Sequence, residues 1–229
     1  MEHTATLPAR TASPTRATML KALLVCGAIS SLVYVGSDII GALLYPGYNY
    51  AGQAFSELLA IGSPVRPFMI ATANIYNLLV IAFGIGVVLS DGAKRSLRVT
   101  GILLVFYGVV SGVGPYIPMH VRGTSTVTGD LPHILITAAT VLAILLFVGF
   151  GSVTRARGFL LFSIATIVAV IAGGALAGTQ VARVAAGLPS PFLGLIERLN
   201  IYATMLWIAV LSIVLLGDRA ARLSEEVGA

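Results

Sequence analysis

Six long apolar stretches decide what this chain can fold into. Each has about 20 residues, the length at which an α-helix crosses a hydrocarbon core of about 30 Å. Gly and Ala are scattered through the stretches, and the alternation of apolar and polar residues that is typical of membrane β-strands is missing. We place the six stretches at residues 19–44, 68–89, 99–115, 131–150, 159–177 and 199–216.

The composition excludes a water-soluble fold. Only 10% of the 229 residues are charged and 57% are hydrophobic, whereas a soluble domain carries about 25% charged residues. We therefore predict an all-α integral membrane bundle of six transmembrane helices, formed by one domain at residues 19–216. Residues 1–18 and 217–229 are expected to be tails, and the first is expected to be disordered because it is polar and rich in Pro and Thr.

Basic residues fall unevenly on the two sides of the predicted membrane. Of the 14 Lys and Arg residues, four lie on the side away from the termini, which leaves ten on the side of the termini. Because cytoplasmic loops retain basic residues, both termini are predicted to be cytoplasmic. The plasma membrane is the expected location and the lipid bilayer the expected partner. No basic cluster with interleaved aromatic residues is present, so nucleic-acid binding is not expected.

The three links on the predicted external side are long and hold most of the polar residues. The first, at residues 45–67, has turn signals at both ends around a short helical stretch. The second covers residues 117–130 and the third residues 178–198. Each link contains at least one acid and one arginine. In the first link we expect Glu57 and Arg66 to pair and to fix the link against the bundle.

Four segments resemble a known family. They read YPGYNYAGQAFSELLAIGSP, GPYIPMH, DLPHILITAA and GLIERLNIYATMLWIAVLSI. Together they are similar to the bacterial and archaeal membrane proteins of the domain of unknown function 998, over about residues 19–216. The resemblance implies a six-helix membrane fold with a polar external face, and it carries no established activity. Glu57, His133 and Arg198 match the family pattern as positions without assigned roles.

Asp38 is the most informative single residue, because an ionisable group inside a span is costly unless it is paired or hydrated. It belongs to a polar stripe at helical spacing that should face the bundle and not lipid. One interpretation is a buried carboxylate that moves a proton or coordinates a cation. We favour the other interpretation, a carboxylate near the outer boundary that pairs with an arginine such as Arg66 or Arg198.

Two histidines and an aspartate have the chemistry of metal ligands. Asp130 and His133 are three residues apart, so they could share a helix face and bind one ion together with His120. Asp130 also precedes Leu131 and Pro132, a pattern typical of a helix N-cap. We favour the cap, so no metal or cofactor is expected, and zinc is the alternative.

Other polar and small residues recur at helical spacing within the spans. Asn74 and Asn77 are three apart, and a polar face of the sixth span begins at Glu197. Interhelical hydrogen bonds explain both patterns. Two pairs of glycines have the GxxxG spacing, which we assign to close packing of helices: Gly108 with Gly112, and Gly174 with Gly178.

Two classes of function remain. The favoured one is non-enzymatic, an external polar vestibule that binds or passes a small polar molecule or a lipid headgroup, or that supports a partner membrane protein. Its candidate residues are Asp38, Glu57, Arg66, His120, Arg122, Asp130, His133, Glu197 and Arg198. The alternative is an intramembrane metal-dependent lipid hydrolase or transferase that uses His120, Asp130, His133 and Glu57. The sequence does not decide whether the chain is an enzyme and assigns no catalytic residue.

Overall fold

The computed structural model describes residues 14–90, 93–154 and 157–228. In these ranges six helices are long and apolar enough to cross a membrane. They are α1 (Pro14–Leu44), α2 (Arg66–Val88), α3 (Arg95–Val113), α4 (Leu131–Ser152), α5 (Arg157–Gly178) and α7 (Leu193–Gly228). The chain is therefore a multi-pass membrane protein, and the predicted all-α fold with six spans is confirmed.

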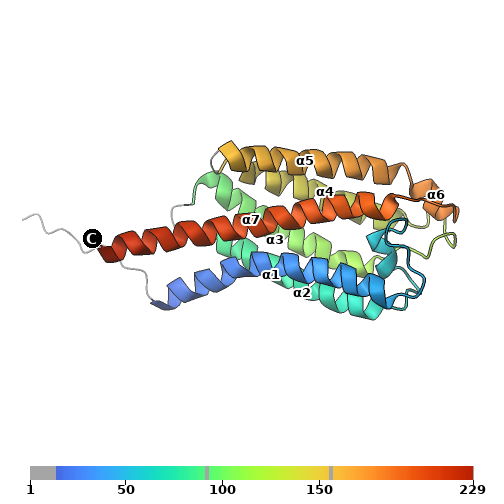
Figure 1. Ribbon diagram of the computed structural model, residues 1–229, viewed down its shortest axis with the longest axis horizontal. Helices are drawn as coiled ribbons and strands as arrows, with labels where there is room; N and C mark the ends of the chain where they lie inside the picture. The colour runs from blue at the N-terminus through green and yellow to red at the C-terminus, as the bar shows by residue number, and fades with distance from the viewer. Residues whose placement is uncertain (1–13, 91–92, 155–156, 229) are drawn as a thin grey trace, which may run out of the picture.

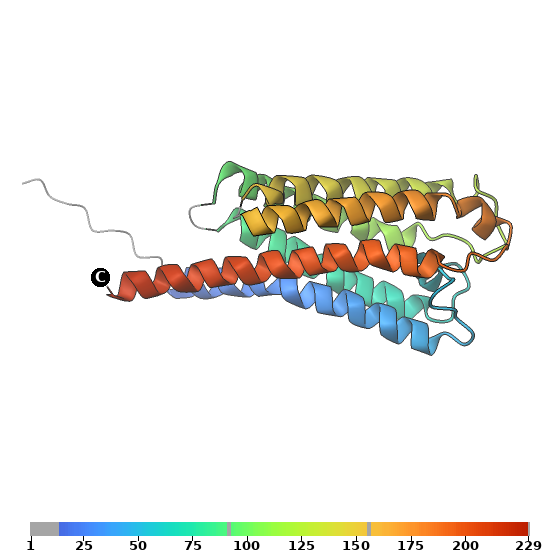
Figure 2. The same cartoon turned by 45° about the horizontal axis from the view of Figure 1, so that its top comes forward.

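The six long helices lie side by side and form a closed ring (Figures 1 and 2). Each helix packs against the one before it in the chain, and α7 packs against both α5 and α1. Three short helices connect them: η1 (Phe55–Leu59), η2 (Gly114–Tyr116) and α6 (Val181–Ala185). We call the end of the ring that carries residues 45–65, 117–130 and 179–192 the link end.

Large side chains fill the middle of the ring. Phe83, Phe147 and Trp207 have no exposed surface. The rings of Phe147 and Trp207 lie 5.4 Å apart, and Nε1 of Trp207 donates a hydrogen bond to Oγ of Ser163 at 2.9 Å. In the described part of the chain the middle of the ring is thus a packed core and not a pore.

The first and last helices are longer than the sequence predicted. Residues 14–18 and 217–228 are helical, which corrects the disorder expected at residues 14–18; residues 1–13 lie outside the described residues. The two helices project together beyond the other four (Figure 2). Nη2 of Arg219 donates to the carbonyl oxygen of Ala17 at 3.0 Å. This pairing extends both helices into segments that are too polar to be predicted as spans.

Helices α2 and α3 come into backbone contact at two glycines. A Cβ atom on Gly101 would lie 2.7 Å from the carbonyl oxygen of Gly84, and one on Gly84 would lie 2.8 Å from that of Gly101. Only glycine permits this approach. Gly108 also faces α2, because a Cβ there would lie 2.7 Å from Cγ1 of Ile81. The packing predicted for Gly108 is therefore confirmed.

Replacing Gly101 with alanine should lower the free energy of unfolding by about 1–3 kcal/mol, because the new methyl group overpacks the contact of α3 with α2. Gly174→Ala is the matched control. Among the described residues, a Cβ at Gly174 or Gly178 would meet no neighbouring side chain or helix within 4 Å, so the close packing expected of that pair is wrong; Gly173 is the glycine of α5 that faces Asn200 of α7. Thermal unfolding in detergent should show a lower midpoint for Gly101→Ala alone, and equal midpoints would contradict the prediction.

Candidate functional site

A buried ion pair joins α1 to α7 near the link end. Asp38 on α1 is 0% exposed and Arg198 on α7 is 3% exposed. Nε of Arg198 donates to Oδ2 of Asp38 at 2.9 Å and Nη2 donates to Oδ1 at 2.8 Å. The guanidinium and the carboxylate thus form a bidentate ion pair, which is stronger than a pair joined by a single hydrogen bond. The favoured expectation, that Asp38 pairs with an arginine, is confirmed with Arg198 as the partner.

Three tyrosines complete what we call the Asp38 cluster: Asp38, Tyr48, Tyr50, Arg198 and Tyr202. The hydroxyl of Tyr202 donates to Oδ2 of Asp38 at 2.6 Å. The hydroxyl of Tyr50 lies 3.0 Å from the same oxygen and 2.6 Å from the hydroxyl of Tyr202. The guanidinium carbon of Arg198 lies 3.6 Å from the ring centroid of Tyr50, a cation–π contact. The cluster therefore combines charge, hydroxyl and aromatic contacts.

Tyr48 connects Arg198 to the first link. Its hydroxyl accepts a hydrogen bond from Nη2 of Arg198 at 3.0 Å and donates to the carbonyl oxygen of Ala54 at 2.7 Å. Burial raises the pKa of Tyr48 well above its ordinary value, and this effect outweighs the opposing influence of the Arg198 charge. The hydroxyl therefore keeps its proton and remains able to donate.

All hydrogen-bond donors of Arg198 bind other groups of the protein itself. Its Nη1 donates to the carbonyl oxygens of Tyr50, Gln53 and Gly194 at 2.9, 3.2 and 3.2 Å. A guanidinium has five N–H groups, and these contacts together with those to Asp38 and Tyr48 use all five. A Cβ on Gly194 would overlap the carbonyl oxygens of Tyr50 and Gln53. Arg198 thus holds the first link tightly against α7 and has no donor left for a ligand.

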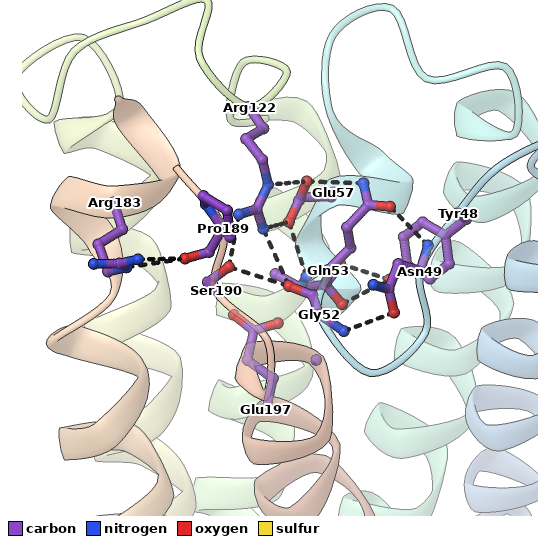
Figure 3. Close-up of polar contacts among 12 residues, drawn as sticks. Tyr48, Asn49, Gly52, Gln53, Glu57, Arg122, Arg183, Pro189, Ser190 and Glu197 are labelled. Carbon is purple, nitrogen blue, oxygen red and sulfur yellow. Dashed lines mark hydrogen bonds and ion pairs between the residues drawn. The ribbon is translucent and has the colours of Figure 1, made fainter. Parts of the chain in front are cut away.

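A second ion pair joins the three links to one another (Figure 3). Nη2 of Arg122, in the second link, donates to Oε1 of Glu57 at 2.6 Å, and Nε donates to Oε2 at 3.2 Å. The other contacts of Arg122 go to Oγ of Ser190 at 2.6 Å and to the carbonyl oxygens of Leu188 at 3.0 Å and Gly52 at 3.2 Å. All five N–H groups of Arg122 are therefore used as well.

The partner of Glu57 differs from the predicted one. Glu57 was expected to pair with Arg66, but its Oε1 accepts from the backbone N–H of Ala54 at 2.9 Å, so the side chain folds back to the start of η1, where Arg122 lies. Arg66 instead donates to the carbonyl oxygens of Leu59 at 3.1 Å and Pro115 at 3.3 Å, at the other end of η1. The pairing fails because the Glu57 side chain reaches the start of η1, whereas Arg66, the first residue of α2, reaches its end.

Glu197 and Arg183 also have local structural partners. Oε2 of Glu197 accepts from the backbone N–H of Phe55 at 2.8 Å, so the α7 carboxylate holds the first residue of η1. Arg183 donates through Nε and Nη2 to the carbonyl oxygen of Pro189 at 3.0 and 2.8 Å, within the third link (Figure 3). The two residues therefore fix backbone segments at the link end.

The two histidines have different partners. Nδ1 of His120 lies 2.7 Å from Oδ1 of Asp130, which also accepts from the backbone N–H of His120 at 3.0 Å. Nδ1 of His133 lies 3.1 Å from the carbonyl oxygen of Ile117. Among the described residues, no three His, Cys, Asp or Glu side chains are placed to hold one metal ion.

Asp130 stands at the N-cap position of α4, as predicted, but its side chain makes no cap hydrogen bond. The carboxylate turns to His120 instead, so the expected role of that side chain is wrong. The contact joins the second link to the start of α4. The first and second links are joined as well, because the backbone N–H of Ile61 donates to the carbonyl oxygen of Met119 at 3.0 Å.

A groove of about 520 Å³ lies on the outside of the ring, beside the Asp38 cluster. Leucines and an alanine of α7 form most of its wall, and Arg198 and Tyr202 lie between them along the helix, next to Tyr50 of the first link. Three of the leucines, Leu195, Leu199 and Leu206, are about half exposed. The lining residues are Tyr50, Leu195, Arg198, Leu199, Tyr202, Ala203 and Leu206.

The family model for proteins of unknown function named DUF998 matches residues 28–214. The chain belongs to this family. The match covers both ion pairs and the groove, and it confirms the resemblance noted in the sequence. No curated protein and no solved structure matches the chain. Membership of DUF998 carries no activity with it, so the chemistry has to be argued from the site.

Several residues of the DUF998 site were not predicted from the sequence: Tyr48, Tyr50, Gln53, Ser190 and Tyr202. Two signals could have found the tyrosines. Tyrosine is enriched at membrane interfaces, and Tyr48 and Tyr50 directly follow the first span. Tyr202 lies four residues after Arg198, which puts both side chains on one helix face. Gln53 and Ser190 have no such signal, since link residues of this kind are usually solvated.

Proposed function

We propose that this chain is a non-enzymatic plasma-membrane protein that binds a lipid sideways, from within the bilayer. The observation that carries the proposal is the groove along α7, whose wall is mostly apolar and which borders the Asp38 cluster at Tyr50, Arg198 and Tyr202. A molecule that fits such a surface has an acyl chain along Leu199 and Leu206 and a headgroup at Tyr50 and Tyr202. The proposal thus replaces the open polar vestibule by a lateral groove.

The hydrogen-bonding capacity of the groove narrows the class of headgroup. Arg198 has no free N–H, so it cannot hold a phosphate. The hydroxyl protons of Tyr50 and Tyr202 are both used inside the cluster: each goes to Asp38, or one goes to Asp38 and the other to the neighbouring hydroxyl. The two hydroxyls therefore offer lone pairs, which accept hydrogen bonds. A headgroup with its own N–H or O–H donors, such as ethanolamine or glycerol, satisfies these acceptors, whereas choline has none to give.

Two further features support binding over passage or catalysis. The middle of the ring is filled by side chains such as Phe147 and Trp207, which favours a ligand on the outside of the ring. Glu57 is bonded to Arg122, and His133 is bonded to the carbonyl oxygen of Ile117. A lipid hydrolase built on these side chains would first have to break their present contacts.

The test is to fill the groove and to measure bound lipid. Ala203→Phe puts a ring into the groove, and Ala138→Phe, at an exposed position of α4, adds the same ring to another outer face. Each protein is purified in a mild detergent, and the bound lipid is measured by native mass spectrometry. We expect about one phosphatidylethanolamine or phosphatidylglycerol per parent chain. The lipid bound to Ala203→Phe should fall to about one tenth of the parent's or less, and Ala138→Phe should retain as much lipid as the parent.

Reconstituted vesicles supply the second measurement. A photoreactive phosphatidylethanolamine should label residues 195–206 more strongly than any peptide of α4, and excess unlabelled phosphatidylethanolamine should compete better than phosphatidylcholine. Equal labelling of α4 and α7, or lipid retained by Ala203→Phe, would refute lateral binding in this groove. Equal competition by the two lipids would refute the inferred headgroup class.

A further inference from the structure

A second groove, of about 420 Å³, lies on the outside of the ring between α2 and α3. It is distinct from the α7 groove and shares no residue with it. Leu78 and Val109 border it and are 68% and 55% exposed. Gly108 and Gly112 leave room in it because they have no side chain. The lining residues are Asn74, Asn77, Leu78, Ile81, Gly108, Val109 and Gly112.

Asn77 lines this groove with an unsatisfied amide. The residue is 5% exposed, and its Nδ2 donates to the carbonyl oxygen of Ala73 at 2.8 Å. Its Oδ1 is buried and has no hydrogen-bond partner in the part of the chain that is described. A buried amide oxygen without a partner is costly, most of all inside a membrane. The oxygen is covered within the single chain, so a donor from another molecule would satisfy it once the Asn77 side chain turns into the groove that it lines.

The depth of Asn77 limits what that molecule can be. Asn77 is the central residue of α2, a helix of 23 residues. Such a helix is about 35 Å long, so Asn77 lies near the middle of the bilayer. Phospholipids have only hydrocarbon chains at that depth. A donor at that level comes from a side chain of another transmembrane helix.

We propose that the occupant of the α2–α3 groove is a second copy of this chain. The side-chain amide of asparagine has two N–H groups and one oxygen. Since one N–H goes to Ala73, each copy keeps one donor and one acceptor. Two copies threaded in the same direction hold Asn77 at the same depth, and a twofold axis between them makes the two amides partners of each other. An unrelated helix would need a donor at the same level.

The shape of the groove fits the same occupant. A Cβ on Gly112 would lie 3.8 Å from Cγ of Asn77, so Gly112 faces the amide and has no side chain to place over it. Each glycine is followed by an exposed valine, Val109 after Gly108 and Val113 after Gly112. Small residues spaced four apart, with branched residues beside them, allow two transmembrane helices to approach closely. Val109 and Val113 of one copy would thus pack over Gly108 and Gly112 of the other.

Cysteine cross-linking of the full chain in membranes tests where the copies meet. The native thiol is removed by Cys26→Ser, and single cysteines are introduced as Val109→Cys or, as the matched control, Leu161→Cys. Leu161 is 57% exposed on α5, on another outer face. A bismaleimide should give a cross-linked dimer with Val109→Cys and little or none with Leu161→Cys. Equal yields from the two positions would overturn the proposal.

Dilution in lipid tests the role of the amide. Fluorescence energy transfer between labelled copies is measured in vesicles as the lipid-to-protein ratio is raised. Asn77→Leu should weaken the dimer by about 30-fold, which corresponds to two hydrogen bonds of about 1 kcal/mol each at about 1.4 kcal/mol per tenfold. Gly112→Ala should weaken it as well, since the added methyl group would stand between the two copies and makes only ordinary van der Waals contact with Asn77 of its own chain.

Both variants should keep the thermal midpoint of the parent chain in detergent, because Asn77→Leu removes an unsatisfied acceptor and the Cβ of Gly112→Ala has no atom closer than 3.8 Å. A parent chain that is monomeric at every lipid ratio would overturn the proposal. Association of Asn77→Leu as strong as that of the parent would overturn it as well. Failure to find lipid in the α7 groove would not change the expected cross-linking or energy-transfer results. The lipid proposal and the dimer proposal can therefore be refuted independently.

Discussion

Replacing Arg198 with methionine should lower the free energy of unfolding by about 3–5 kcal/mol, the loss typical of breaking a buried ion pair. The first reason is Asp38, which has no exposed surface and would remain as an uncompensated charge. The second reason is the first link, since the carbonyl oxygen of Tyr50 would lose its donor and that of Gln53 would keep only the Tyr48 hydroxyl. Methionine has a similar length, so the loss would report the charge and the hydrogen bonds and not a cavity.

Thermal unfolding in detergent, followed through the fluorescence of the single tryptophan, Trp207, measures the effect. Arg183→Met is the matched control, because it removes an arginine at the same end of the ring whose hydrogen bonds go only to Pro189. Its effect should stay below about 1 kcal/mol. Adding Asp38→Asn to Arg198→Met should restore part of the stability by removing the buried charge. Equal midpoints for the two single variants would contradict the structural role of Arg198.

The spans and the direction of the polar stripe could be predicted because they depend on local sequence. A run of about 20 apolar residues has one stable environment, the bilayer, whatever its neighbours are. The spacing around Asp38 likewise indicated one polar face of α1, and the residue is fully buried inside the ring. That it would find an arginine follows from the cost of an unpaired charge in a membrane.

The choice of partners could not be predicted, because it depends on how distant segments are placed. Asp38 and Arg198 are 160 residues apart in the chain, and Glu57 and Arg122 are 65 apart. From the sequence alone, Arg66 was a candidate partner of both Asp38 and Glu57. The turn of η1 determines which arginine pairs with Glu57, since it directs the Glu57 side chain toward the start of η1 and leaves Arg66 at its end. A five-residue helix of this kind is too short to show in any periodic pattern.

The tyrosines were missed for a related reason. Tyr50 and Tyr202 carry no charge, so a pattern of charged residues does not indicate them, yet their hydroxyls complete the shell around Asp38. The groove that they line depends on the path of the first link across α7, which the sequence does not encode locally. Charge patterns thus indicate the end of the bundle that holds the site, and tertiary contacts decide its form.

Glu57→Leu should lower the free energy of unfolding by about 3 kcal/mol, because Arg122 would keep its charge without a partner. Arg122 has only 17% of its side chain exposed, so water would compensate little of the loss. The backbone N–H of Ala54 would lose its acceptor at the same time. Since Arg122 also holds Leu188 and Ser190, all three links should become more accessible, which limited proteolysis can follow.

A comparison of double variants decides between the two partners considered for Glu57. Residues in direct contact show a coupling energy, whereas separate sites add within about 0.5 kcal/mol. Glu57→Leu combined with Arg122→Met should therefore cost less than the sum of the single effects, by about 1 kcal/mol or more. Glu57→Leu combined with Arg66→Met should be additive, because Arg66 donates to the carbonyl oxygens of Leu59 and Pro115 and not to Glu57. Coupling to Arg66 and additivity with Arg122 would restore the pairing expected from the sequence and refute the one in the structure.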